Sequence, residues 1–153
     1  MTTIAYKDGV IATDGRTTRG DTIVDDDTVK RYEKRGAVFW MSGRPHEFYA
    51  VLDAIIDRTE GGKDEYSAGG IALIDGELFN CGYCDGSGWR YPLSSNIEAY
   101  GSGADHALTA MDMCSTAYEA VAMAAQRDIG TGGTIRLYDA KTGEGLDASE
   151  ERG

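Results

Sequence analysis

The stretch TTIAYKDGVIATDG, residues 2–15, decides the fold because it contains a complete β-hairpin. Polar and apolar residues alternate in its first half, Asp8-Gly9 is a strong turn signal, and VIATD continues the extended pattern. The hairpin begins with two threonines that directly follow Met1. Removal of Met1, the only maturation step we expect, would make Thr2 the first residue. Thr2 would then carry a free amine and a hydroxyl group.

The composition indicates one globular domain over residues 1–153, with residues 148–153 as a frayed tail. Apolar residues make up 41% of the chain, which is enough for a core. A net charge of -11 disfavours binding to nucleic acid or to anionic membrane surfaces. The sequence has no run long enough to span a membrane and no secretory signal, so we expect a cytoplasmic protein. Its three cysteines argue against a disulfide framework.

Downstream of the hairpin, the pattern alternates between groups of strands and groups of helices. Strands are expected in two short pieces of 20–32, in 37–43, in a hairpin over 70–82 that turns at Asp75-Gly76, in 97–103 and in 134–146. Helices are expected over 45–58, 104–114 and 116–127, the last capped by Ser115 or Thr116, and residues 83–96 are expected to be irregular. Because helices do not alternate one by one with strands, antiparallel sheets covered by helices fit better than a parallel sheet.

An N-terminal threonine needs particular neighbours to act as a nucleophile. Its hydroxyl reacts poorly until a base takes the proton, and its own amine, with a pKa of about 7.7–8.0, can be that base. A nearby cation, Lys30 or Arg31, would favour the neutral amine. Asp14, at the end of the second strand, could pair with that cation. The backbone N–H of Gly43 could bind a developing oxyanion.

Several segments together resemble one known family. Residues 2–20, TTIAYKDGVIATDGRTTRG, resemble the beginning of proteasome β-type subunits and of the bacterial peptidase HslV. Further matches follow in the same order: VKRY (29–32), FWMSG (39–43), AYGSGADHAL (99–108), and AAQRDIGTGG with TIRLY (124–138). These matches together span most of the chain, and five matches in the same order are more specific than any single one.

The resemblance implies a threonine-type endopeptidase of the N-terminal nucleophile hydrolase class. The family fold is a four-layer α-β-β-α sandwich, an α+β fold with two antiparallel sheets between helices. The implied roles are Thr2 as nucleophile, Asp14 and a basic residue as modulators of its amine, Gly43 as oxyanion donor, Ser102, Asp128 and Thr131 as groups that orient the N-terminus, and Thr17 and Met41 as substrate-pocket residues.

The basic residue can be assigned in two ways. Counting from Asp14 without a gap selects Lys30, whereas matching the basic pair of VKRY selects Arg31. On a strand the two side chains would point to opposite faces, so only one could reach the site. We expect Lys30, because a slim ammonium fits beside an amine better than a forked guanidinium.

The resemblance also implies partners. These are a peptide or unfolded-protein substrate, a homo-oligomeric ring and an unfoldase ATPase. No cofactor or metal is expected, because Cys81 and Cys84 have too few further soft ligands for a zinc site. Each predicted site residue alone also has an ordinary structural explanation. Two alternatives therefore stay open: a catalytically silent scaffold of the same fold, and an amidohydrolase that acts on a small amide.

Overall fold

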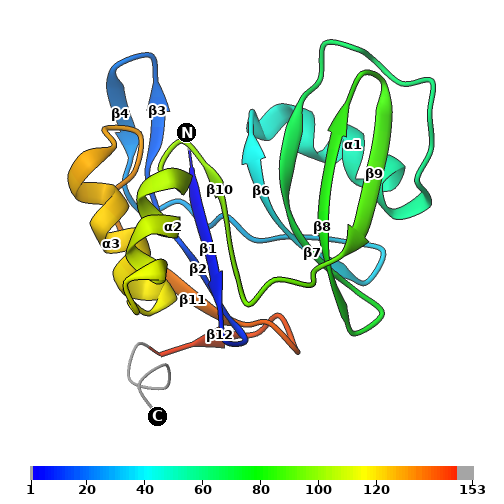
Figure 1. Ribbon diagram of the computed structural model, residues 1–153. Coiled ribbons are helices and arrows are strands. Elements are labelled where there is room, and N and C mark those ends of the chain that lie inside the picture. Colours follow the sequence, from blue (N-terminus) through cyan, green and yellow to red (C-terminus); the bar gives the residue numbers. More distant parts are fainter. Residues whose placement is uncertain (1, 148–153) are drawn as a thin grey trace.

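The computed structural model describes residues 2–147, and this part of the chain forms three helices and three sheets (Figure 1). Met1 and the expected frayed tail, residues 148–153, lie outside the described residues. The predicted α+β class with antiparallel sheets is confirmed.

The first sheet contains the N-terminal hairpin at its centre. Its five strands are antiparallel and lie in the order β10 (Ile97–Gly101), β1 (Thr3–Lys7), β2 (Val10–Thr13), β11 (Arg136–Asp139) and β12 (Gly145–Leu146). Strand β1 therefore has a partner on both sides. Residues Thr3–Lys7 are thus held within the sheet rather than at its edge.

The second sheet is built from the middle of the chain. Its antiparallel strands follow in sequence order: β5 (Tyr32–Lys34), β6 (Ala37–Gly43), β7 (Ala68–Ile74), β8 (Glu77–Cys84) and β9 (Ser87–Pro92). A two-stranded ribbon of β3 (Thr17–Arg19) and β4 (Thr22–Asp25) follows β2 of the first sheet and precedes β5 of the second. The ribbon extends away from both sheets near the N-terminus (Figure 1).

The helices pack against different sheets. Helices α2 (Ala104–Asp112) and α3 (Ala117–Arg127) contact each other and the first sheet, whereas α1 (Pro45–Asp57) contacts the second sheet, mainly β9 and β8 (Figure 1). Thr116 caps α3: its hydroxyl accepts the N–H of Glu119, whose carboxylate accepts the N–H of Thr116. This reciprocal pair is a capping box, and it selects Thr116 over Ser115 as the N-cap.

Residue size differs between the two helix-facing sides. The α2–α3 side is built largely from alanines, including Ala5, Ala12 and Ala120, which let the helices approach closely. The α1 side contains large residues such as Phe39 and Phe48. A third cluster joins the two sheets through strands β1, β2, β6, β7 and the end of β11, and consists of Ile4, Ile11, Val38, Trp40, Ile71, Leu73, Tyr138 and Ala140. Adjacent residues such as Ile4 and Ala5 thus serve opposite faces.

The expectation that residues 83–96 are irregular is wrong for most of that range. Strand β8 continues to Cys84, the chain turns at Asp85-Gly86, and β9 runs from Ser87 to Pro92. Asp85 and Gly86 both have a positive φ, which is typical of a tight hairpin turn. The many glycines of this segment therefore indicate a hairpin rather than a loop.

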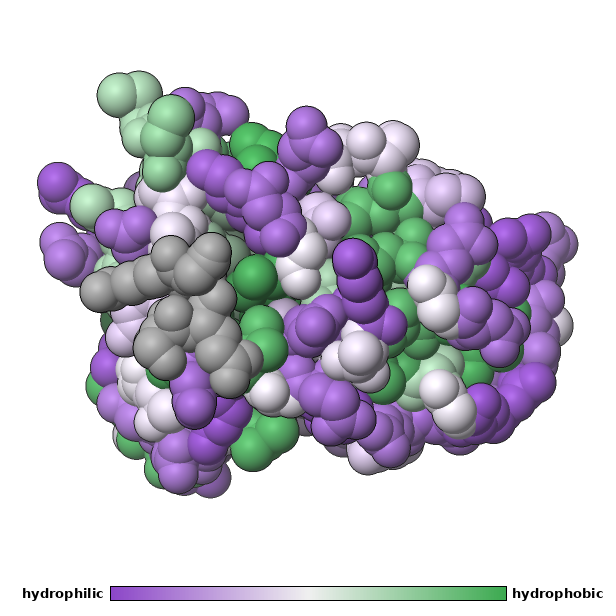
Figure 2. All heavy atoms as spheres, turned by 90° about the horizontal axis from the view of Figure 1, so that it is seen from below, coloured by the Kyte–Doolittle hydropathy of each residue, from purple (hydrophilic) through white to green (hydrophobic). Residues whose placement is uncertain are grey.

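Hydrophilic residues cover most of the face seen from below, with separate smaller hydrophobic patches (Figure 2). None of the helices among residues 2–147 has the length and apolar character needed to cross a membrane.

Candidate active site

The two threonines before and at the start of β1 are buried. Thr2 is only 6% exposed, and Thr3 pairs with Gly101 of β10. Gly101 has φ +103°, and a Cβ atom there would lie 1.7 Å from the carbonyl oxygen of Thr2. Only glycine fits this close approach without displacing the chain. The backbone of Thr2 is therefore held firmly against the end of β10.

Asp14, directly after β2, is fully buried and accepts four hydrogen bonds. Its Oδ1 accepts the Thr3 N–H at 3.0 Å and the Lys30 ammonium at 2.7 Å. Its Oδ2 accepts the N–H groups of Gly132 at 3.1 Å and Arg16 at 3.3 Å. A buried carboxylate is stable only with such partners. Asp14 thus joins the start of β1, the Lys30 segment and the 128–133 turn.

Lys30, and not Arg31, pairs with Asp14. The Lys30 ammonium also donates to the carbonyl of Arg16 at 2.7 Å, and burial lowers its pKa although the charge of Asp14 opposes this. Arg31 instead donates to the carbonyl of Gly143 and forms an ion pair with Glu33. Both basic residues immediately precede β5 and do not lie on a strand, so the prediction that they point to opposite faces of a strand was wrong. Lys30, the residue expected at the site, nevertheless pairs with Asp14.

A chain of hydroxyl groups connects Thr3 to Asp128. The hydroxyls of Ser102 and Thr131 both donate to Asp128 Oδ2 at 2.6 Å, and the Thr131 oxygen lies 2.6 Å from the Thr3 hydroxyl. Because Thr131 directs its proton to Asp128, Thr3 donates to Thr131. Burial opposes ionisation of Asp128. The bonds from Ser102, Thr131 and the Gly130 N–H, with the charge of His106, outweigh burial and lower its pKa.

A small cavity of about 50 Å³ brings several predicted residues together. It is lined by Thr2, Thr17, Thr18, Thr28, Lys30, Tyr32, Gly43, Pro45 and Phe48. We call it the Thr2 cavity. Gly43 ends β6 with φ +142°, and a Cβ there would meet the Ser67 carbonyl at 2.9 Å. The cavity therefore places a buried threonine, a buried ammonium and a glycine backbone around one space.

Met41 does not line this cavity, which corrects its predicted role. It is fully buried in the core beneath α1, with its sulfur 3.7 Å from the Cys81 thiol. Alternation along β6 explains this position, because Met41 faces the helix together with Phe39. The cavity wall is formed instead by Tyr32, Pro45 and Phe48, which the sequence analysis did not select.

Sequence reasoning also missed Thr3 and Gly101. The repeated threonine at positions 2 and 3 was a usable signal, because neighbouring residues on a strand point to opposite faces. One of the two threonines could therefore face the second sheet while the other faced helices α2 and α3. Gly101 gave no signal that separates it from an ordinary turn glycine.

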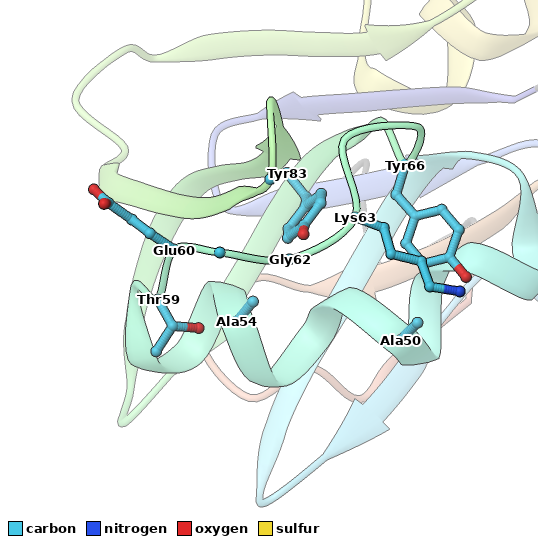
Figure 3. Close-up of a pocket in the computed structure, with 10 residues that line it drawn as sticks. Ala50, Ala54, Thr59, Glu60, Gly62, Lys63, Tyr66 and Tyr83 are labelled. Carbon is cyan, nitrogen blue, oxygen red and sulfur yellow. The ribbon is translucent and has the colours of Figure 1, made fainter.

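A larger cavity of about 410 Å³ lies elsewhere, between α1 and the loop that follows it (Figure 3). The ammonium of Lys63 lies 5.4 Å from the centre of the Tyr66 ring at one end, and Tyr83 forms part of the wall. None of the predicted site residues lines this cavity.

The cysteines do not form a paired site. Cys81, Cys84 and Cys114 are all free, and burial raises the pKa of the Cys81 thiol. Within residues 2–147, no group of three or more His, Cys, Asp or Glu side chains is arranged to hold a metal ion.

The chain matches no model of a known protein family and no curated protein.

Proposed function

We propose that this protein is an N-terminal-threonine peptidase of the proteasome and HslV type, and that Thr2 becomes its nucleophile when Met1 is removed. The observation that carries the proposal is the Thr2 cavity, which Thr2 shares with Lys30 and Gly43. The ion pair between Lys30 and Asp14 adds support, because it fixes a cation at the cavity wall.

The packing of the chain supports the fold part of this proposal. Helices α2 and α3 contact the first sheet, the two sheets share an apolar cluster, and α1 contacts the other side of the second sheet. That order is the one expected of the four-layer α-β-β-α sandwich of the family.

The chemistry would proceed through an ester. The Thr2 amine accepts the hydroxyl proton while Oγ attacks the carbonyl carbon of a peptide bond. Lys30 favours the neutral amine, and the Gly43 N–H stabilises the oxyanion. The C–N bond then breaks, and the proton passes to the leaving amine. Water hydrolyses the Thr2 ester, with the amine again acting as base.

Ser102, Asp128 and Thr131 would act as positioning residues in this mechanism. Their hydrogen bonds reach Thr3, and Thr3 is the residue that follows the nucleophile. Asp14 holds the same residue through its N–H. The backbone after Thr2 is therefore fixed by groups on both sides.

Intact-mass measurement with a threonine-directed electrophile tests the proposal. We expect loss of one methionine mass and a single label on Thr2, with cleavage of fluorogenic peptides. Thr2→Ala abolishes both labelling and cleavage, whereas Thr22→Ala, on the exposed β4, leaves both unchanged. Retention of Met1 with no labelling contradicts the proposal and favours the silent scaffold. Cleavage of small amides but no peptides favours the amidohydrolase.

The proposal extends to a homo-oligomeric ring that an unfoldase ATPase supplies with substrate. Exposed apolar side chains support an interface: Met113 is 80% exposed and Ile129 is 79% exposed. Native mass spectrometry tests the ring directly, and a monomer at micromolar concentration contradicts it.

A further inference from the structure

The Thr2 cavity adjoins a wider cleft of about 630 Å³. Thr18, Gly43 and Pro45 line both spaces, so the two are adjacent. The other lining residues of the cleft are Gly20, Ser42, Arg44, Glu47, Glu65 and Ser67. A peptide with its cleaved carbonyl between Thr2 and Gly43 would continue into this cleft.

Glu47 is the unusual residue of the cleft. It lies in the first turn of α1, and its side chain is only 6% exposed. Arg44 Nη1 and His46 Nε2 lie 3.8 and 3.9 Å from the same oxygen, Oε1, which is too far for a hydrogen bond. Within residues 2–147, neither oxygen of Glu47 accepts a hydrogen bond.

The surroundings of Glu47 favour a cationic ligand. The carboxylate oxygens of Glu47 remain in contact with solvent in the cleft, and the positive end of the α1 dipole stabilises their negative charge. The Arg44 side chain is 77% exposed, so solvent screens its charge and weakens its attraction to Glu47. A charged donor that enters the cleft can therefore form strong hydrogen bonds with Glu47. Glu65 adds a second carboxylate to the lining.

We infer that Glu47 is a specificity residue that binds a lysine or arginine side chain of the substrate. The inference rests on the proposed function, since it places a peptide at Thr2. Because Gly43 and Glu47 line the same cleft, we expect the basic residue close to the cleaved bond.

Fluorogenic peptides in which one position at a time is lysine or norleucine test this inference. The two side chains have similar length but differ in charge. We expect a kcat/KM ratio of about ten in favour of lysine at one position. The ratio falls to about one in Glu47→Gln and in high salt, because screening weakens an ion pair at a cleft mouth.

Matched variants separate the role of Glu47 from a general effect of charge. Glu77→Gln removes an exposed carboxylate at the start of β8 and leaves the ratio unchanged, whereas Glu65→Gln lowers it partly. Because the ratio compares two peptides on one variant, a change in the amount of folded protein cancels. A wild-type ratio of one at every position, or an unchanged ratio in Glu47→Gln, overturns the inference.

Failure of the proposed function gives a different result. If the wild type cleaves no peptide, fluorescence polarisation with the same labelled peptides measures their binding instead. Tighter binding of the lysine peptide that is lost in Glu47→Gln supports the inference. Equal binding of the lysine and norleucine peptides contradicts it.

Discussion

Asp14 and Glu47 are both buried acidic residues near the candidate active site, but their surroundings are opposite. Asp14 accepts four hydrogen bonds and pairs with Lys30, whereas Glu47 accepts none among residues 2–147. Asp128 is intermediate, with bonds from Ser102, Thr131 and Gly130. The difference indicates which acid holds the structure together and which one is available to a ligand.

Asp14→Ala gives the largest expected effect. It leaves the Lys30 ammonium buried without its counterion and removes the acceptor of three backbone N–H groups. We expect a loss of about 3–5 kcal/mol in the free energy of unfolding, measured by urea denaturation. Asp112→Ala, at the exposed end of α2, is the matched control and changes stability little. An Asp14→Ala loss below about 1 kcal/mol means that Asp14 does not hold the site together.

Asp128→Asn has an intermediate effect that depends on pH. The pKa of Asp128 is lowered from 3.8 in the folded protein, so its ionised form stabilises the fold above pH 3.8. That contribution is lost as the pH falls through the folded-state pKa. We therefore expect the wild type to be more stable than the variant at neutral pH, with a difference that shrinks below pH 3.8. Thermal unfolding across this pH range measures it, and a constant difference contradicts the assignment.

Glu47→Gln has the smallest expected effect on folding. Because the carboxylate of Glu47 accepts no hydrogen bond from the described residues, its replacement leaves no donor unsatisfied. We expect a change of less than about 1 kcal/mol in the same urea experiment, of either sign. A loss as large as that of Asp14→Ala would show that Glu47 also holds the structure together, and the comparison would fail.

Local patterns predicted most of the fold. The Asp8-Gly9 and Asp75-Gly76 turns and the apolar spacing of α1 follow from neighbouring residues, so the sequence contains them. Strand β9 (Ser87–Pro92), which forms a hairpin with β8, was missed because the glycines of this segment suggested a loop more strongly than the alternation around Trp89 suggested a strand. Its pairing with β8 comes from tertiary contacts that local propensity does not report.

The candidate site was predictable from two sources, the chemistry of an N-terminal threonine and the family resemblance. The chemistry selected Asp14 and a basic neighbour, Lys30 or Arg31, and the resemblance added Ser102 and Asp128. Their contacts join segments far apart in the sequence. Met41 was placed wrongly because the motif does not say which face of β6 lines a cavity. Glu47 carried no signal, since its importance comes from burial without hydrogen bonds and not from its neighbours in sequence.

The pairing of β1 with β10 has a consequence for the timing of maturation. An aminopeptidase needs a free, extended chain end, but Thr2 is buried and Thr3 is paired with Gly101, nearly 100 residues later in the chain. Ribosomes add about 5–20 residues per second, so β10 emerges roughly 5–20 s after the N-terminus. On the proposed function, we therefore expect the initiator methionine to leave during this interval of synthesis, before β10 pairs with β1.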